Sequence, residues 1–588
     1  MKEIVRRELL EYTQAFPVYS LGEIETTIRS QVIDWLGNNP DVVAKLTISK
    51  AARSKFGDLT IPCFQLARLF GRNPVVVASE LARRLSSTTQ IDDVSGYEPD
   101  GSFVNIRLNY DVFGARVLEN VVNSNMRYGS ENLGHGANLL VDMSSPNMAR
   151  RMTVGCLRST IIGDSIARIL RFNGFSITRD NHLGDWGMKF GHLLNGVSRF
   201  GNMEAIKHRP LEELEKIYVR AIKEAEFDEN IRERGKETLR KLELGDPELQ
   251  NLWQRVVDWS LEDYGDIYRM LGVDFEIALR DSFYNPMVTS TLERIKRSGI
   301  TRENEGAIVV DLSDKDLGIA LIQKTNESPS YLAREIATVL YRLEQLKVEG
   351  ILYVVGNDQT LFFQQLFEVM RRMGYDISAK CRHVAFGMIT LPEGKINTLT
   401  QKILPRDIID RLMEKSRAMI IDKSRSRDGV GDREGVIRAI AIGALKWFNL
   451  SVDPRQSYMF DWDRMLDLDS NGAVYIQYTH ARICSLLKRS AIDPKTNVKG
   501  IEHPLEKQLI LNIAEFNRVV RRSAEEFNPS YIATYLSDLC HTFNKLYQDL
   551  RIVGVSQENF NRLAITSAVR QVIANGLFLL GIDAPQII

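Results

Sequence analysis

Two kinds of hydrophobic pattern alternate in the middle of this chain. A short apolar run at Leu139–Met143 is followed by a turn at Ser144–Asn147. From about Gly155 to Phe172 apolar residues recur with helical spacing, and a second apolar run covers Phe175–Arg179. Strand, helix and strand in this order predict the opening of a doubly wound parallel sheet, in which ligands bind at the carboxyl ends of the strands.

The same patterns extend this unit in both directions. We expect its further elements to be strands at Ala307–Leu312, Ile351–Gly356 and His383–Ile389 and helices at Tyr331–Leu346 and Leu361–Met373. Nearer the N-terminus, Val75–Leu85 has helical spacing behind Asn73-Pro74, and Ser102–Leu108 alternates like a strand. After about Gly435 the pattern is helical, without strand signals.

These patterns predict an α/β plus all-α protein in three parts. Residues 1–125 would form an N-terminal α/β domain and residues 126–435 a Rossmann-like domain with a helical insertion at about 192–280. Residues 436–588 would form an all-helical domain.

Composition excludes several other classes. With 588 residues, 44% hydrophobic and 26% charged, the chain can bury full-sized cores and is not disordered. The charges of its 76 basic and 76 acidic residues cancel, so the net charge does not indicate a nucleic-acid partner. A local basic groove is still compatible with this balance. Five scattered cysteines argue against a disulfide framework or a zinc site. The charged N-terminus and the lack of a long apolar run predict a cytoplasmic protein without a secretory leader or membrane span.

Several strings along the chain match one family in order. They are FGD (Phe56–Asp58), VDMSSPN (Val141–Asn147), LRSTIIGD (Leu157–Asp164), NHLGDWG (Asn181–Gly187), YLAREIA (Tyr331–Ala337), GNDQ (Gly356–Gln359), LPEGK (Leu391–Lys395), FDWDRML (Phe460–Leu466), QYTHARI (Gln477–Ile483) and ANGLFLLGI (Ala574–Ile582). Together they resemble the arginyl-tRNA synthetases over nearly the whole chain.

This resemblance implies a class I synthetase fold and a function. The N-terminal part resembles the extra domain of the family, and the helical part resembles its anticodon-binding bundle. The family activates arginine with ATP, together with Mg²⁺, and attaches it to tRNA. The resemblance therefore implies tRNA and arginine or a close analogue as partners, no tightly bound cofactor, no membrane, and a monomer.

The resemblance also implies roles for individual residues. Asn147, Tyr331 and Gln359 match positions that hold the amino acid, and Glu335 stands where the family has the aspartate that pairs with the guanidinium. A carboxylate beside a tyrosine suits a planar, bidentate cation. The other implied residues are Ser144 and Asp185 for the substrate, Gly155, Lys395 and Thr398 for ATP, and Gln477, Tyr478, His480 and Arg482 for tRNA.

Both ATP signatures of the family are altered here. Where the family has His-x-Gly-His, this chain has Thr153-Val-Gly-Cys156, and its second signature keeps Lys395 and Thr398 but has Leu399 and Thr400 at two basic positions. Imidazoles would donate to the charge that develops on the phosphates, whereas a threonine donates one neutral hydrogen bond and a cysteine is a poor donor. Catalytic roles would fall to Thr153, Cys156 and Lys395.

Each candidate residue also has a structural interpretation. Asn147 could serve as a turn residue, Asp185 as a cap, and Glu335 as part of a solvated helix face. His480 and Arg482 could be ordinary core or surface residues. Cys156 could accept an arginyl group as a thioester, because a helix N-terminus lowers the pKa of a thiol, or it could fill the space of a lost histidine.

Three functions remain open at this point. The first is a diverged arginine–tRNA ligase with weakened ATP activation. The second is a repurposed paralogue that has lost adenylation and binds arginine or arginyl-tRNA for transfer to another acceptor. The third is a non-catalytic tRNA-binding protein.

Overall fold

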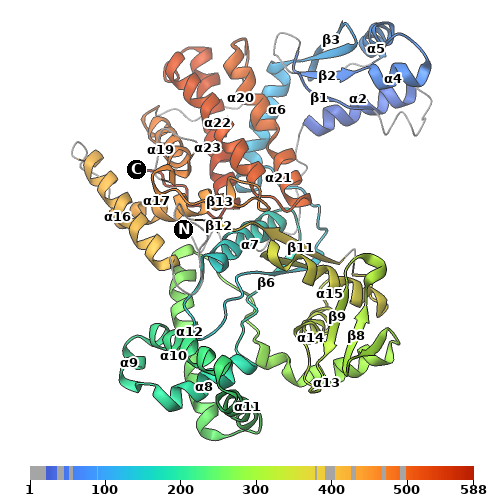
Figure 1. The fold of residues 1–588 in the computed structure, drawn as a ribbon. Coiled ribbons are helices and arrows are strands. Elements are labelled where there is room, and N and C mark those ends of the chain that lie inside the picture. The colour runs from blue at the N-terminus through green and yellow to red at the C-terminus, as the bar shows by residue number, and fades with distance from the viewer. Residues whose placement is uncertain are drawn as a thin grey trace.

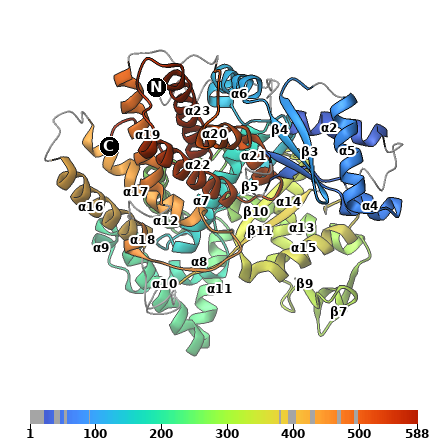
Figure 2. The same cartoon turned by 90° about the horizontal axis from the view of Figure 1, so that it is seen from above.

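The computed structural model describes residues 21–35, 46–51, 57–88, 91–377, 380–390, 404–424, 432–465, 472–490 and 498–588. Figure 1 shows a central α/β unit, a small N-terminal unit and a helical unit that lies between them. Figure 2, the view from above, shows the N-terminal strands and helices to one side of the helical unit.

The central unit is built on a four-stranded parallel sheet in the order β11-β10-β5-β6. Its strands are β5 (Asn138–Asp142), β6 (Ser176–Asp180), β10 (Gly350–Gly356) and β11 (Cys381–Phe386). Leu140 of β5 lies opposite Thr178 of β6 on one side and Ile351 of β10 on the other. The strand order therefore reverses between β5 and β10, and open α/β sheets bind ligands at such a switch point, beyond the carboxyl ends of the strands.

Helices cover both faces of this sheet. They are α7 (Val154–Phe172) on one face and α14 (Tyr331–Glu344) and α15 (Thr360–Arg372) on the other. Because side chains alternate along a strand, Val141 enters the core beneath α7, while Leu140 enters the core beneath α14 and α15. Gly163 allows α7 to approach the sheet closely, since a Cβ there would lie 2.5 Å from Met143. The predicted doubly wound sheet and its helices are confirmed.

One predicted strand lies in a different sheet. The strand at Ala307–Leu312 exists as β8 (Ala307–Asp311), but it pairs with β7 (Thr301–Asn304) and β9 (Ile319–Gln323) in a separate antiparallel sheet. Glu305 and Gly306, both with positive φ, make up the connection between β7 and β8. A two-residue connection forms a hairpin, whereas parallel neighbours need a long crossover, so its expected place in the doubly wound sheet was wrong.

A helical insertion follows β6. It consists of α8 (Met188–Phe200), α9 (Met203–His208), α10 (Pro210–Phe227), α11 (Glu229–Glu243) and α12 (Pro247–Leu271). Side chains of Asn202, Asp228 and Asp246 accept hydrogen bonds at the starts of α9, α11 and α12. The next helix, α13 (Asp281–Arg297), returns the chain to the strand ends. Figure 1 places α8–α11 at the end of the molecule opposite the N-terminal unit.

The N-terminal unit is an antiparallel sheet with helices. Its strands, in the order β1-β2-β4-β3, are β1 (Ser49–Lys50), β2 (Leu59–Pro62), β4 (Phe103–Leu108) and β3 (Val94–Asp100), and its helices are α2 (Leu21–Trp35), α4 (Phe64–Phe70) and α5 (Pro74–Thr88). The helix and strand predicted at Val75–Leu85 and Ser102–Leu108 are confirmed as α5 and β4. The following helix, α6 (Tyr110–Ser124), packs against the helical unit, on α20 and α23.

The helical unit occupies the C-terminal part of the chain. Its helices are α17 (Arg433–Leu450), α18 (Trp462–Met465), α19 (Ala473–Ser490), α20 (Pro504–Ala514), α21 (Phe516–Glu525), α22 (Ser530–Asp549) and α23 (Gln557–Leu579), with α16 (Pro405–Ser424) packed on α17. Short 3₁₀ helices elsewhere in the described ranges include η2 (Asn125–Arg127), η3 (Ser313–Lys315) and η4 (Asn357–Gln359). The expectation of no strand after Gly435 was wrong, because β13 (Tyr458–Met459) pairs with β12 (Ile389–Thr390). Two residues are too short to carry an alternating pattern.

None of the described helices combines the length and the apolarity that a bilayer crossing requires.

Candidate functional site

A strained turn follows β5 at the switch point. Ser144, Ser145 and Ala149 have φ values of 73°, 49° and 64°, which residues other than glycine rarely adopt. The amide of Ser144 donates to Ser159 Oγ of α7 at 2.9 Å, and the amide of Ser145 donates to Asn181 Oδ1 at 3.1 Å. Such conformations persist only where the surroundings hold them, so α7 and the loop after β6 together impose the shape of the turn.

Two tyrosines of α12 hold the same turn from the insertion side. The Tyr264 hydroxyl donates to the carbonyl oxygens of Asn147, at 2.7 Å, and Arg150. The hydroxyls of Tyr268 and Ser144 are 2.7 Å apart and buried. Ser144, predicted to bind substrate, therefore uses its hydroxyl to fix the turn in this structure.

The altered first signature forms the start of α7. Thr153 is the N-cap, and its Oγ1 accepts from the amide of Cys156 at 3.3 Å and donates to Cys156 Sγ at 3.3 Å. Among the described residues, a Cβ at Gly155 would meet only Thr153 Oγ1, at 3.6 Å. An open helix N-terminus suits the phosphates of a nucleotide, because its amides point outward.

Cys156 lies in surroundings that keep it a thiol. Burial raises its pKa above the ordinary value, although Thr153 and Arg150 act in the opposite direction. A protonated thiol is a poor nucleophile. The geometry therefore favours the space-filling interpretation of Cys156 over the thioester.

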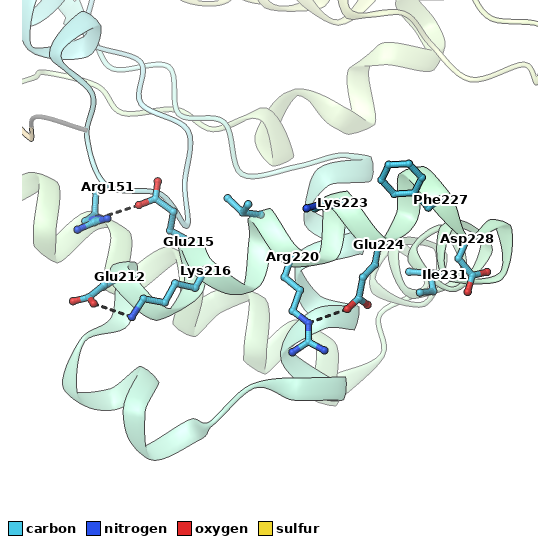
Figure 3. A pocket seen from close by; sticks show the side chains of 11 residues that line it. Arg151, Glu212, Glu215, Lys216, Arg220, Lys223, Glu224, Phe227, Asp228 and Ile231 are labelled. Atoms are coloured by element: carbon cyan, nitrogen blue, oxygen red, sulfur yellow. Dashed lines mark hydrogen bonds and ion pairs between the residues drawn. The ribbon is translucent and has the colours of Figure 1, made fainter. Parts of the chain in front are cut away.

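A groove lies on α10 and α11, at the edge of the insertion. It has a volume of about 960 Å³, and Figure 3 shows Arg151 at one end of it. Arg151 Nε donates to Glu215 Oε2 at 3.0 Å, and Lys216 and Arg220 pair with Glu212 and Glu224. Arg151 is thus paired with the insertion and does not supply a free charge to the phosphate side of the turn.

Four predicted arginine-binding residues share one property. Asn147, Tyr331, Glu335 and Gln359 make no side-chain hydrogen bond to any part of the chain that the structure describes. They come from the turn after β5, from the first two turns of α14 and from η4 after β10. Glu335 is only 7% exposed, and burial raises the pKa of its carboxyl group. A buried carboxylate without a donor is costly unless a ligand supplies one.

Gly184 marks the place where two of the polar groups come together. A Cβ added there would lie 2.8 Å from Asn147 Oδ1 and 3.7 Å from Asp281 Oδ2. Gly184 also bridges to Asn147 through the backbone. The lack of a side chain at residue 184 thus keeps open the space between a carboxamide and a carboxylate.

A buried ion cluster lies beneath these groups. Arg342 is fully buried, and its Nη2 donates to Asp142 Oδ2 at 2.6 Å and to Asp180 Oδ2 at 2.7 Å, the last residues of β5 and β6. Arg342 follows Glu335 by seven residues and so lies on the same face of α14. The ion cluster therefore anchors α14 across the strand ends and places Glu335 above them.

His182 lies between this cluster and the polar groups. Its Nε2 is 2.9 Å from Asp281 Oδ1, its Nδ1 is 3.5 Å from Arg342 Nη2, and its ring stacks on Tyr284 with centroids 5.3 Å apart. Burial by itself would lower the pKa of the imidazole, but the hydrogen bond to Asp281 and the charge of Glu335 raise it to about 9.

The carboxylate of Asp185 is hydrogen-bonded within the fold. It is fully buried, and its two carboxylate oxygens accept from the amide and the hydroxyl of Ser282, at 2.8 and 2.7 Å. Burial raises the pKa of this carboxyl group, despite those bonds. Asp185 thus holds the start of α13 next to Asp281, and its direct contact with substrate stays a prediction. Lys395 and Thr398 lie outside the described residues.

The chain is similar to known proteins over most of its length. The family model described as "tRNA synthetases class I (R), catalytic domain" matches residues 117–462. The chain is 36% identical over 542 residues to an arginine–tRNA ligase of Streptococcus agalactiae, covering 91% of this chain and 94% of that one. The chain belongs to the arginyl-tRNA synthetase family. An arginine–tRNA ligase of Lactococcus lactis is 34% identical over 92% of this chain and 95% of its own length.

Two more models place the other parts of this arginyl-tRNA synthetase family member. An arginyl-tRNA synthetase N-terminal domain model matches residues 22–108, and a DALR anticodon-binding domain model matches residues 476–588. Among solved structures, arginyl-tRNA synthetases of Plasmodium falciparum and Thermus thermophilus share the fold, with TM-scores of 0.82 and 0.80. They are 24% and 22% identical, cover 98% and 97% of this chain, and are themselves covered in full.

The residues of α19 that the resemblance relates to tRNA differ in exposure. Gln477 is fully buried and donates to the carbonyl oxygens of Ala439 and Asp583. His480 is 4% exposed and bonds the carbonyl of Pro585 at 2.9 Å. These two side chains hold the C-terminal segment. Tyr478 and Arg482 are half-buried, with the Arg482 guanidinium 5.3 Å from the Tyr478 ring, and they alone of the four could reach a bound tRNA.

Three residues of the site were missed from the sequence. His182 lies inside the string Asn181–Gly187 but carried no assigned role, and Arg342 could have been found from its spacing to Glu335 on one helix face. Asp281 had no such signal, because it meets His182 only through the fold, 99 residues along the chain.

Proposed function

We propose that this protein is an arginine–tRNA ligase that forms arginyl-adenylate from arginine and ATP and passes the arginyl group to tRNA. The observation that carries the proposal is Glu335 near the β5/β10 switch point, a residue only 7% exposed whose carboxylate accepts no hydrogen bond from the part of the chain that the structure describes. A guanidinium offers five N–H donors in a fixed fork and keeps its positive charge at every physiological pH. It would therefore supply both the hydrogen-bond donors and the opposite charge that the Glu335 carboxylate needs.

The pocket would hold arginine from both ends. Glu335 and Asp281, whose charges interact, would take the guanidinium, and Tyr331 lies near both carboxylates. The carboxamides of Asn147 and Gln359 would take the α-amino and α-carboxylate groups, because each offers both donors and an acceptor. The carboxylate would then lie near the start of α7, where the backbone of Gly155 is open.

The reaction would proceed in two steps. The arginine carboxylate attacks the α-phosphorus of ATP, a carboxylate–phosphorus bond forms, and the bond to the bridging oxygen breaks to release pyrophosphate. A ribose hydroxyl of tRNA then attacks the carbonyl carbon, loses its proton, and releases AMP. Thr153 and the amides of α7 would stabilise the phosphate charge in the first step, with Mg²⁺ accompanying ATP as part of the substrate.

Adenylation should be slow compared with family members that keep both imidazoles. Thr153 offers one neutral donor, which it already directs at Cys156, and all eight histidines of the chain lie elsewhere. This observation favours a second candidate, a paralogue that binds arginine or arginyl-tRNA without activating it. We expect the ligase to act as a monomer in the cytoplasm.

The deciding experiment is arginine-dependent ATP–pyrophosphate exchange by the purified chain, with and without tRNA. Exchange above background supports the ligase. Glu335→Gln should lower kcat/KM for arginine at least about thirtyfold, because it removes one partner of a buried charge pair worth about 2–5 kcal/mol.

Glu344→Gln is the matched control for this test. Glu344 lies near the end of the same helix, pairs with Arg294 at 2.6 Å and is partly exposed, so exchange should be unchanged. No exchange by a chain that still binds arginyl-tRNA would reject the ligase and leave the non-activating paralogue.

A further inference from the structure

Charged side chains of both signs, from four secondary-structure elements, lie around His182. Asp281 of α13 bonds Nε2, and Glu335 of α14 adds a second negative charge. Arg342, also of α14, faces Nδ1 and pairs with both Asp142 of β5 and Asp180 of β6, so one guanidinium meets two carboxylates. Burial and the charge of Asp142 raise the pKa of Asp180, which favours a proton on this cluster. Outside the cluster, His182 faces the carboxylates of Asp281 and Glu335, and besides Arg342 a protonated His182 is the cation that acts on Glu335 among the described residues.

The hydrogen-bond geometry identifies which proton is weakly held. A guanidinium can only donate, so Nδ1 at 3.5 Å from Arg342 Nη2 is placed to accept, and Nε2–H is placed to donate to Asp281. In the protonated ring, Nδ1–H would face the N–H of Arg342, which is a repulsive contact. The hydrogen-bond geometry at Nδ1 favours the neutral ring, whereas the negative charges of Asp281 and Glu335 favour the protonated ring.

Arginine would change this balance. If arginine binds as proposed above, its guanidinium adds a permanent positive charge to the space occupied by Asp281 and Glu335. The guanidinium of bound arginine would lower the pKa of His182, because a protonated imidazole and a guanidinium would then repel each other beside the same two carboxylates. The ring can lose its Nδ1 proton and accept from Arg342, while its Nε2–H stays on Asp281.

We propose that His182 is a specificity-determining residue of the arginine pocket, whose imidazolium neutralises Asp281 and Glu335 until a guanidinium replaces it and one proton leaves Nδ1 for the solvent. This inference rests on the proposed function. It explains how two acidic side chains are kept in an empty pocket, and it favours ligands that carry a full positive charge. A neutral isostere such as L-citrulline cannot replace the imidazolium.

The raised pKa of His182, to about 9, sets the sign of the effect. Below this pH, His182 is protonated before arginine binds, so binding must release a proton. The affinity for arginine therefore rises with pH. Above it the ring is already neutral, and the dependence ends. Between pH 7 and 8.5 we expect the dissociation constant to fall by up to about tenfold per pH unit, the slope of one released proton.

The test is calorimetric titration of the full chain with L-arginine at pH 7.0 in PIPES and in HEPES, which differ in heat of ionisation. The difference between the two enthalpies counts the protons released. We expect close to one proton for the native chain and close to none for His182→Gln, which should still bind arginine. L-citrulline should release none.

Two controls separate this proton from other sources. Burial raises the pKa of Glu335, so a proton from Glu335 would also leave on binding, but it would persist in His182→Gln. His383 bonds the carbonyl of Val355 at 3.1 Å, and burial lowers its pKa, so it is neutral already and His383→Gln should release the same number as the native chain.

The outcomes are distinguishable. Absence of arginine binding by the native chain would reject the arginine pocket itself. Binding without proton release, or equal release in native chain and His182→Gln, would reject the role of His182 alone. If His182→Gln fails to fold, the pH dependence of the native dissociation constant decides, because a flat profile between pH 7 and 8.5 contradicts the exchange.

Discussion

At the scale of single residues, four side chains of the proposed arginine pocket, Asn147, Tyr331, Glu335 and Gln359, form no hydrogen bond with the part of the chain that the structure describes. Hydrogen bonds instead hold the residues around them: Ser144 bonds Tyr268, and Asp185 bonds Ser282. Of these four only Glu335 is buried, so it is Glu335 that indicates a ligand, because a buried polar group is otherwise paired.

Gly184→Ala tests the free space in this pocket. A methyl group would lie 2.8 Å from Asn147 Oδ1 and push the carboxamide aside. We expect KM for arginine in pyrophosphate exchange to rise about tenfold, the effect of one lost hydrogen bond. Gly265→Ala is the control, since nothing lies within 4 Å of the added methyl in helix α12. An unchanged KM in Gly184→Ala would show that Asn147 does not contact arginine.

At the scale of elements, α7 contacts the segment that leads into β13. Its first turn carries Thr153 and Cys156, and one turn later Arg158 is fully buried. The Nη2 of Arg158 donates to the carbonyls of Pro454 and Gln456, just before β13, and β13 pairs with β12. The segment that contains Lys395 follows β12 directly, so α7 helps to set where that segment begins.

Restoring the imidazoles tests whether the start of α7 limits activation. Thr153→His combined with Cys156→His should raise the exchange rate at least about tenfold, because a donor aimed at developing charge typically contributes about 2.7–4 kcal/mol. A rate that stays the same would mean that the substitutions at the helix start are not what slows adenylation.

Cys156→Ser is the companion variant. Burial raises the pKa of the thiol, which disfavours a covalent role for the sulfur, and we expect exchange and arginylation of tRNA to stay within about threefold of the native rates. Loss of arginylation in Cys156→Ser with exchange intact would instead support the thioester.

At the scale of the whole molecule, buried charges join the catalytic and helical domains. Asp164 of α7 accepts from Arg168 at 2.7 Å and Arg179 at 3.0 Å. Lys446 of α17 interacts with the same carboxylate and donates to the carbonyl of Gly581, after α23. Although burial alone would raise it, these cations hold the pKa of Asp164 below its ordinary value.

Asp164→Asn should therefore destabilise the protein and change its response to acid. Removing one partner of a buried ion network costs about 3–5 kcal/mol. An acid with a lowered folded pKa stabilises above its unfolded pKa, and this contribution disappears as pH falls, between about pH 5 and pH 1.

Urea unfolding midpoints at pH 7 and pH 4 check both points. The midpoint of Asp164→Asn should be lower at pH 7 and fall less between the two values than that of the native chain. Glu237→Gln, at an exposed pair with Arg240, should match the native midpoints. Equal midpoints for Asp164→Asn and the native chain would contradict a stabilising role.

The sequence by itself determined the order and type of the main elements and the family. Hydrophobic spacing is a local property, so α7, α14 and the strands of the parallel sheet could be predicted from it. The family strings also located Asn147, Tyr331, Glu335 and Gln359, whose roles as arginine ligands stay predictions.

Tertiary structure alone decided which polar side chains are hydrogen-bonded or buried within the fold and which are available to a ligand. That Asp281 meets His182, that Gln477 and His480 are buried, and that β8 leaves the parallel sheet all depend on contacts between distant segments. No local pattern encodes such contacts, because burial and charge pairing are set by what the folded chain brings together.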